Sequence, residues 1–381
     1  MISRTFKIEI AELRSRPAEL MVRTACKYPC RITVEHGSRS INAKSMMGVF
    51  SLELAEGDEL TVVADGEREQ EALADIAALI ESKFQLPEHK YSGGVTMNRI
   101  GVMAESFGIG VPGGMERAAQ LGAAAVQVYV GGRGATQNVW TPEYRREIRN
   151  KAHDCGLVIS AMCGDLGGHA FEGREENDEW RIAEVGRMFE LCQDMDCTIL
   201  TNHIGRVPSD KAHPRYAVMV DAMQRIDRLG RETGCYLAIE TGPETPETLK
   251  GFLEDIGGTN IGINYDPANL KMVLDVDAAQ GVRTLAGHIL HTHAKDGKIF
   301  KFMGGEEVYG IFCDGGIEEL QKLGEYFQEV PLGEGDVDWD SYIAALNEIG
   351  YKGYFTIERE CGADPTSDIR QAVEFLRRRL G

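Results

Sequence analysis

Four side chains in the second half of the sequence have the chemistry of a metal site. Glu240, Asp266, His293 and Glu358 each stand at the end of a short apolar segment, in CYLAIE, IGINYD, HILHTH and YFTIE. Carboxylates and an imidazole suit Mn²⁺, Mg²⁺ or Co²⁺, and Zn²⁺ also accepts them. Three carboxylates in one small volume need a cation or shifted protonation. We therefore expect a divalent metal ion where these segments converge.

The segments that carry these residues have the pattern of buried parallel strands. Eight such segments alternate with amphipathic helical patterns: Arg99–Ala104, Ala124–Tyr129, Leu157–Cys163, Thr198–His203, Tyr236–Glu240, Asn260–Asp266, Ile289–His293 and Tyr354–Glu358. This count predicts a (β/α)8 TIM barrel over residues 98–381, in which the C-terminal strand ends meet at one site. A doubly wound sheet is the alternative, but its GxGxxG turn is missing after the first segment.

Residues 1–86 have a different pattern and predict a separate small domain. The expected order is strand (Thr5–Ile10), helix (Pro17–Lys27), strands (Arg31–Glu35 and Ser40–Ala43), helix (Ser45–Leu54), strand (Leu60–Ala64) and helix (Glu67–Phe84). That order indicates an α+β open-faced sandwich, with helices on one side of a small sheet. A proline and a glycine pair without apolar periodicity mark residues 87–97 as a linker.

Two motifs of the first domain carry a resemblance. Leu13-Arg14-Ser15-Arg16-Pro17-Ala18 and Lys44-Ser45-Met46-Met47-Gly48-Val49 resemble the histidine-containing phosphocarrier protein (HPr) of the sugar phosphotransferase system. In that family a histidine accepts the phosphoryl group, and Arg14 replaces it here. Arginine cannot carry a phosphoryl group in that relay, so we expect no phosphocarrier activity.

Ser45 has two interpretations. It aligns with the serine that the family's regulatory kinase phosphorylates, at the start of a predicted helix where a phosphate would be stabilised. Serine is also an ordinary helix N-cap. With Arg14 and Arg16 close to a helix start, the domain could bind an anion or a regulatory protein and act as a sensor or docking module.

The second domain resembles the xylose-isomerase-like superfamily of sugar and sugar-phosphate isomerases and epimerases. The motifs are Ile239-Glu240-Thr241, Asn264-Tyr265-Asp266-Pro267, Thr292-His293-Ala294-Lys295-Asp296, Pro331-Leu332-Gly333-Glu334-Gly335 and Thr356-Ile357-Glu358. The resemblance implies that Glu240, Asp266, His293 and Glu358 bind the metal. It also implies that Glu240 and Glu358 are catalytic: one removes a proton next to a ketose carbonyl, and the other returns it to the resulting enediolate.

The same resemblance suggests residues that face the substrate. These are His203 and Arg206 in Asn-His-Ile-Gly-Arg, together with Asn264, His291 and Lys295. His203 could equally be a core histidine. His291 competes with His293 as a metal ligand because it lies two residues back on the same face of the strand. We favour His293 because the family's His-x-Lys-Asp pattern begins there.

Two other functions remain open at this point. The metal cluster also suits dehydration of an inosose-like ketose, in which a carboxylate or His203 would protonate a leaving hydroxyl. A third possibility is a non-catalytic sugar sensor that signals through the HPr-like domain. DNA repair nucleases share the barrel, but they need a basic face and a polynuclear site rich in histidine.

Composition narrows the partners further. The net charge of −19 repels phosphate backbones and anionic lipids, so we expect neither nucleic acid nor membrane as a partner, and a small carbohydrate as substrate. The start MISRTFKIEI lacks the apolar core of a signal peptide, which predicts a cytoplasmic protein with reduced cysteines. A homo-oligomer is compatible with the sequence, which gives no way to test it.

Overall fold

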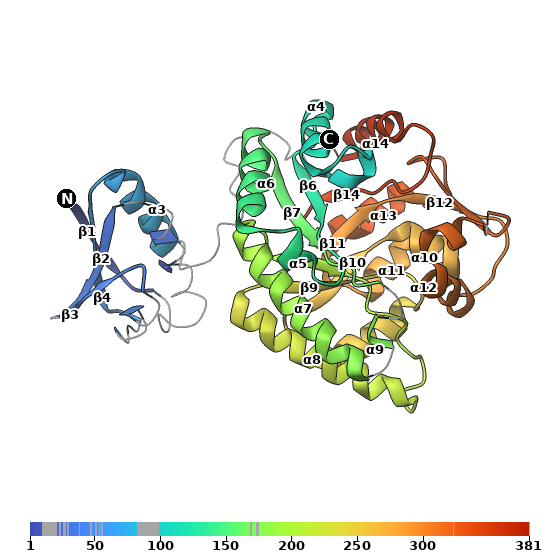
Figure 1. Ribbon diagram of the computed structural model, residues 1–381, viewed down its shortest axis with the longest axis horizontal. Coiled ribbons are helices and arrows are strands. Elements are labelled where there is room, and N and C mark those ends of the chain that lie inside the picture. The colour runs from blue at the N-terminus through green and yellow to red at the C-terminus, as the bar shows by residue number, and fades with distance from the viewer. Residues whose placement is uncertain are drawn as a thin grey trace. The chain divides into compact units, whose positions relative to one another are not determined.

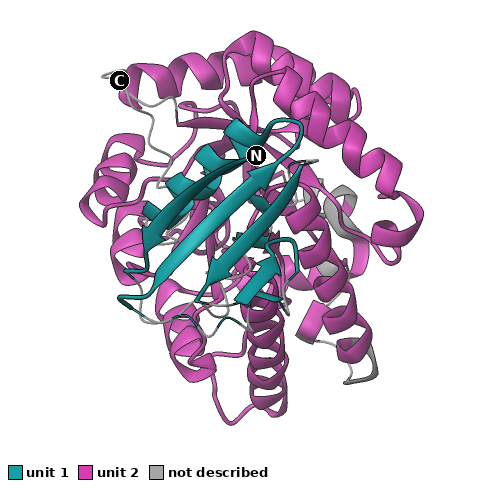
Figure 2. Ribbon diagram, turned by 90° about the vertical axis from the view of Figure 1, so that its left-hand side faces the viewer, with its two compact units in different colours: residues 1–95 teal, residues 96–381 magenta. Residues whose placement is uncertain are grey.

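The computed structural model describes residues 1–9, 21–22, 24–25, 28, 30–37, 39–45, 48–49, 52, 54, 56–81, 99–167, 170–172, 175–322 and 324–380. The chain divides into two compact units, Met1–Val95 and Thr96–Gly381, which Figure 2 colours separately. The predicted linker at 87–97 lies outside the described residues, and the domain boundaries at 86 and 98 remain a prediction. Among the described helices, none is long and apolar enough to cross a membrane.

The first unit is the predicted open-faced sandwich. An antiparallel sheet in the order β1-β4-β2-β3 is formed by β1 (Ile2–Lys7), β2 (Arg31–His36), β3 (Arg39–Asn42) and β4 (Glu59–Asp65). Helix α3 (Glu69–Glu81) buries Ala72, Ile76 and Ile80, which recur every four residues on one face. Strand β1 begins three residues earlier than predicted, because its pairing with β4 starts at Ile2 opposite Ala64. The predicted helices at 17–27 and 45–54 fall largely outside the described residues.

The second unit is the predicted TIM barrel (Figure 1). Its parallel strands are β5 (Ile100–Met103), β6 (Ala125–Tyr129), β7 (Val158–Cys163), β8 (Ile199–Asn202), β9 (Tyr236–Glu240), β10 (Ile261–Tyr265), β11 (Ile289–Ala294) and β14 (Phe355–Ile357). The barrel closes where β14 pairs with β5, with Phe355 opposite Ile100. Closure leaves no free sheet edge and brings all eight C-terminal ends to one face.

Helices surround the strands. They are α4 (Val111–Leu121), α5 (Ala135–Asn138), α6 (Pro142–Asp154), α7 (Glu175–Asp194), α8 (Pro214–Thr233), α9 (Pro246–Ile256), α10 (Pro267–Leu274), α11 (Ala278–Thr284), α12 (Gly305–Gln321), α13 (Trp339–Glu348) and α14 (Pro365–Leu380), with short 3-10 turns at Ala104–Phe107 and Ala170–Glu172. Thr141 and Thr245 cap α6 and α9 immediately before a proline, a strong signal for a helix start.

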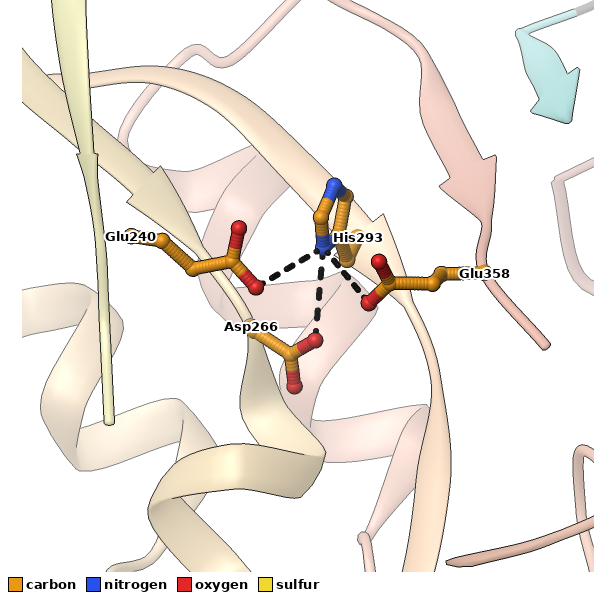
Figure 3. Close-up of side chains that lie close together, drawn as sticks. All are labelled: Glu240, Asp266, His293 and Glu358. Atoms are coloured by element: carbon orange, nitrogen blue, oxygen red, sulfur yellow. Dashed lines mark ion pairs between the residues drawn. The ribbon is translucent and has the colours of Figure 1, made fainter. Parts of the chain in front are cut away.

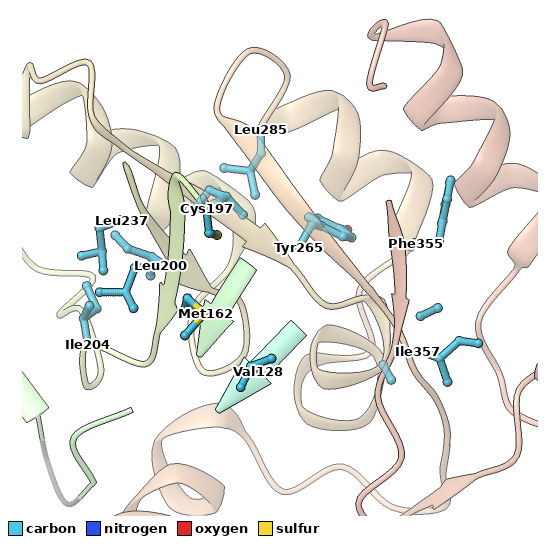
Figure 4. Packing of buried hydrophobic residues seen from close by; sticks show 14 of the residues in the cluster. Val128, Met162, Cys197, Leu200, Ile204, Leu237, Tyr265, Leu285, Phe355 and Ile357 are labelled. Carbon is cyan, nitrogen blue, oxygen red and sulfur yellow. The ribbon is translucent and has the colours of Figure 1, made fainter. Parts of the chain in front are cut away.

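Apolar side chains from strands and helices pack into one core around the barrel (Figure 4). Leu200, Leu237 and Phe355 are fully buried there. In Figure 4, Val128, Met162 and Leu200 lie along neighbouring strands, as expected for strands whose outer faces are covered by helices. This packing holds the strand ends in fixed positions.

One segment differs from its prediction in detail. The sequence suggests that the long segment from Gly297 to Pro331 is a helical insertion, with its apolar stretch at 317–327. The structure has a helix there, but α12 begins at Gly305, and two strands flank it. Strands β12 (Asp296–Ile299) and β13 (Phe327–Val330) pair as an antiparallel two-stranded sheet. Such short strands have too little local pattern to be recognised without their partners.

Candidate metal centre

The four predicted ligands come together in one buried cluster at the ends of β9, β10, β11 and β14 (Figure 3). One ligand atom from each of Glu240, Asp266, His293 and Glu358 lies within 4.8 Å of the other three. His293 Nδ1 lies 3.4 Å from Glu240 Oε1, 3.4 Å from Asp266 Oδ2 and 3.2 Å from Glu358 Oε2. All four residues are buried. Residues up to 118 positions apart in the sequence thus share one site.

Strand register explains this convergence. Asn264 pairs with Glu240 on one side and with His291 on the other, and Thr356 pairs with His293. Because alternate residues of a strand point to the same face, Asn264, His291 and Thr356 face inward two residues before Asp266, His293 and Glu358, and they form a lower layer. The four ligands lie at or just beyond the strand ends and form the next layer, at the mouth of the barrel.

The lower layer holds His291 away from the ligand atoms. His291 Nδ1 lies 2.9 Å from Asn264 Oδ1, and its Nε2 lies 3.0 Å from Thr356 Oγ1. Burial lowers the pKa of His291 well below its usual value, so its ring is neutral. Both ring nitrogens are therefore occupied by protein groups, and the geometry favours His293 as the ligand. Asn264 Nδ2 donates to Glu240 Oε2 at 3.1 Å, so this residue orients a ligand.

The hydrogen bonds of His293 determine which nitrogen faces the carboxylates. Its Nε2 lies 2.9 Å from Gln127 Oε1, and the Gln127 amide donates to Thr201 Oγ1 at 2.9 Å. Asn264 Nδ2 also lies 3.2 Å from His293 Nε2. The Gln127 contact is the shorter of the two, and donation to its oxygen places the ring proton on Nε2 and leaves the Nδ1 lone pair toward the three carboxylates. A buried glutamine in strand β6 is thus the outer partner of the proposed ligand.

The cluster fits a divalent cation. His293 Nδ1 and Asp266 Oδ2 are buried atoms that make no hydrogen bond to any described residue, although buried polar atoms nearly always have a partner. With Nε2 protonated, the four facing atoms are all acceptors, and a cation would satisfy them together. Without a cation, burial lowers the pKa of His293, but Glu358 and Glu240 raise it well above its usual value. Without the cation, a proton on His293 would therefore compensate part of the negative charge of the three carboxylates.

A cavity of about 150 Å³ adjoins the cluster. Its walls include Glu240, Glu358, His203, Asp165, Lys295 and Tyr309. Two proposed ligands are therefore accessible to a small molecule. Tyr309 of α12 packs against Gly242, where an added Cβ would come within 1.7 Å of its Oη, so α12 closes directly over the end of β9.

His203 lines this cavity and is held by Asp165. The backbone N of His203 donates to Asp165 Oδ1 at 2.6 Å, and its Nδ1 lies 2.8 Å from Asp165 Oδ2. Its Nε2 lies 3.9 Å from Glu240 Oε1. Burial lowers the pKa of His203, but Asp165 and Glu240 raise it to about 10. His203 is thus a cationic group beside a proposed ligand, which agrees with the substrate-facing alternative.

Lys295 bridges two carboxylates on the other side of the cavity. Its Nζ donates to Glu358 Oε2 at 3.0 Å and also to Glu360 Oε2. Burial raises the pKa of Glu358, but Lys295 and His293 hold it well below its usual value. Glu358 therefore stays ionised although it is buried.

The remaining predicted residues lie elsewhere. Arg206 pairs with Glu306 of α12 at 2.9 Å. The described residues that line the cavity do not include Arg206, Asn264 or His291. In the first unit, Ser45 Oγ accepts from Gly48 N at 3.2 Å, as an N-cap does. Its regulatory role remains a prediction, and Arg14 lies outside the described residues.

Three residues of the site were not found from the sequence. Asp165 stands two residues after the end of β7, in CGD, which is close to the signal that identified the four ligands. Gln127 is the one polar residue in AVQVYV, and a lone amide in a buried strand needs a partner. Tyr309 had no local signal, because its position depends on how α12 packs.

Comparison with known proteins agrees with both units. Residues 115–379 match the family described as xylose isomerase-like TIM barrel, and residues 2–82 match the PTS HPr component phosphorylation site family. The first unit is similar to the HPr-like protein Crh of Bacillus subtilis (strain 168), at 41% identity over 71 residues, which cover 19% of this chain and 84% of Crh.

Among solved structures, the second unit is similar to a xylose isomerase domain protein from Planctomyces limnophilus. The identity is 28% and the TM-score 0.60, over 73% of this chain and 96% of that one. The probable 3-DHS dehydratase AsbF from Bacillus anthracis has 18% identity and a TM-score of 0.57, over 73% and 98% of the two chains. A D-psicose 3-epimerase, solved in the presence of D-fructose, has 18% identity and a TM-score of 0.55, over 74% and 99%. The last two share the fold. The chain belongs to the xylose isomerase-like TIM barrel family and carries an HPr-like unit at its N-terminus.

Proposed function

We propose that this protein is a divalent-metal-dependent isomerase or epimerase of a ketose, in which Glu240 and Glu358 exchange a proton with one substrate carbon. The observation that carries the proposal is the acceptor-only cluster, in which His293 Nδ1 and Asp266 Oδ2 are buried without a hydrogen bond. Burying such a set of acceptors is costly unless a cation binds to them.

The placement of the two glutamates supports proton exchange. They end strands that are separated by β10 and β11 in the barrel, and in Figure 3 they reach the cluster from opposite sides. Both line the same cavity of about 150 Å³. A planar enediolate bound between them would expose one face to each carboxylate, so one removes the proton and the other returns it.

The surrounding residues prepare each glutamate for its part. Asn264 and Asn269 donate to the two oxygens of Glu240, at 3.1 and 3.2 Å, and hold its orientation. Lys295 and His293 keep Glu358 ionised, as a base requires. A bound divalent cation supplies Lewis acidity, which makes the C–H next to a carbonyl more acidic. Family membership and the shared fold with a D-psicose 3-epimerase are in keeping with this activity.

A dehydratase is the second candidate, and His203 is the observation that favours it. This side chain is held by Asp165, lines the cavity and lies 3.9 Å from Glu240. An imidazolium there could give its proton to a leaving hydroxyl after Glu240 or Glu358 removes the proton on carbon. The product would then be a deoxy ketone and water, with no inverted or isomerised sugar.

The test is incubation with ketoses and inososes in D₂O, followed by NMR. The protein is stripped with a chelator and reconstituted with Mn²⁺, Co²⁺ or Mg²⁺. An isomerase or epimerase puts solvent deuterium at the inverted carbon or next to the carbonyl, and the stripped protein is inactive. Release of a deoxy product would support the dehydratase instead. Full turnover by extensively stripped protein would show that the metal proposal is wrong.

A further inference from the structure

We infer that the natural substrate carries a second, uncharged group, such as a further sugar residue, which binds in a separate cavity next to the cluster. The inference rests on the proposed function, because it assumes that the reacting ketose binds at the cluster. It adds a substrate class: glycosides of a ketose or oxo sugar, in preference to free ketoses or phosphate esters.

A second and larger cavity lies beside the first. It has a volume of about 630 Å³ and shares five wall residues with the cluster cavity: Asn269, Met272, Lys295, Phe327 and Glu360. Its other walls include Gln328 and Glu329 of β13 and Arg359 and Cys361, which follow β14. The shared residues place the two cavities next to each other, so the inference requires that one ligand spans both.

The two volumes match different parts of one ligand. The cluster cavity, of about 150 Å³, is the smaller of the two and lies against the proposed ligands, where the reacting part of the substrate would bind. Ligand cavities usually measure about 300–1,000 Å³, so this cavity alone is small for a complete ligand. The second cavity of about 630 Å³ lies within that range and leaves ample room for a further ring.

The charges around the second cavity favour a neutral group. Its two cationic side chains already have anionic partners. Lys295 donates to Glu358 and Glu360, and Arg359 donates to Glu329 at 2.5 Å and to Asp368 at 2.9 Å. A phosphate would have to compete with these carboxylates, of which the side chains of Glu358 and Glu329 are buried, at a cost that an uncharged hydroxylated group avoids.

The wall residues of the second cavity that take part in no ion pair have the chemistry to bind a sugar. Gln328 is exposed to the cavity, and its amide makes no hydrogen bond to the described residues. Phe327 and Met272 provide apolar surface nearby, and Asn269 lies where the two cavities meet. An amide beside an aromatic ring can bind the hydroxyls and the C–H face of a sugar ring.

Binding measurements on the metal-reconstituted full-length protein test the inference. Calorimetry would compare D-fructose, a galactosyl-fructose disaccharide and a fructose phosphate ester. We expect the disaccharide to bind at least about tenfold more tightly than fructose, because a second buried ring adds contacts, and the phosphate ester to gain nothing. Gln328→Trp narrows the second cavity and should remove the advantage of the disaccharide, whereas Gln328→Ala, which loses the amide but leaves the space open, should reduce that advantage less.

The outcomes separate this inference from the proposed function. The inference is wrong if the disaccharide binds no more tightly than fructose, if the phosphate ester binds most tightly, or if Gln328→Trp weakens both sugars equally. Cys361→Trp, which enters the cavity from another wall, repeats the test should the first variant fold poorly. If the disaccharide preference holds but no solvent deuterium enters any sugar, the proposed chemistry fails and the two-cavity binding site stands.

Discussion

Replacing Asp266 by Asn should separate metal binding from folding. Asp266 has two roles, one for each oxygen: Oδ1 caps α10 by accepting from Asn269 N at 2.8 Å, and Oδ2 faces His293 Nδ1 without a hydrogen bond. Asparagine is an equally good N-cap, so the helix start is kept. Its amide nitrogen replaces the proposed ligand oxygen by a donor, which repels a cation.

The expected magnitude follows from linkage. Loss of an outer partner of a ligand typically weakens metal binding roughly 10–100-fold, and loss of a ligand itself should cost at least as much. At a metal concentration of about 1,000 Kd, binding stabilises the wild-type fold by about 4.1 kcal/mol. A variant with about 100-fold weaker binding would gain only about 1.4 kcal/mol at the same concentration. Without metal the variant should be at least as stable as the wild type, because one of three clustered negative charges is gone.

The assay combines calorimetric titration with Mn²⁺ and urea unfolding with and without metal. All three tryptophans, Trp140, Trp180 and Trp339, lie in the second unit, so tryptophan fluorescence follows the barrel alone. Asp277→Asn is the matched control, since Asp277 caps α11 by accepting from Gln280 N at 2.7 Å and is not one of the clustered ligands. If Asp266→Asn bound Mn²⁺ as tightly as the wild type and the control, Asp266 could not be a ligand.

Three further predictions follow from the same contacts. Glu358→Gln should lower turnover roughly 10²–10⁴-fold even where calorimetry shows retained metal, because a general acid–base is lost; near-wild-type turnover would contradict the two-glutamate mechanism. The pKa of His203 is raised from 6.5 to about 10, so its stabilising contribution in metal-free protein is complete below pH 6.5 and is lost as the pH rises toward 10. Urea unfolding across this window should show a decline in the free energy of unfolding that the His203→Gln variant lacks. An identical decline in the variant would exclude His203 as its source. The phosphotransferase enzymes should transfer no phosphoryl group to the first unit, because Arg14 stands at the acceptor position; detection of phosphohistidine at His36, the one histidine of residues 1–86, would refute this expectation.

Much of the fold could be predicted because its signals are local. The barrel strands are short apolar runs, of which β9, β10 and β14 end at or just before a carboxylate, and helix starts such as Thr245-Pro246 are marked in the sequence. The eightfold alternation of these patterns is enough for a barrel, and the same reasoning recovered the small sandwich. The pair β12 and β13 was missed because strands of four residues are defined by their pairing.

The candidate ligands could be predicted for a related reason. A barrel brings its C-terminal strand ends together whatever the loops between them do, so three acids and a histidine at the ends of four apolar runs must converge. Asp165 also lies near the C-terminal end of a barrel strand, so the same reasoning could have predicted it. The sequence alone therefore determined which residue types gather at the mouth, and that they include three carboxylates and an imidazole.

Only the tertiary structure decided how those residues act. The sequence pattern already favoured His293 over His291, but the hydrogen bonds that orient the two rings come from Gln127, 166 positions from His293, and from Asn264 and Thr356. The second cavity depends on the β12–β13 pair, and on the carboxylates that already occupy Lys295 and Arg359. These are contacts between distant strands, set by register and packing, and no periodicity within a single segment encodes them.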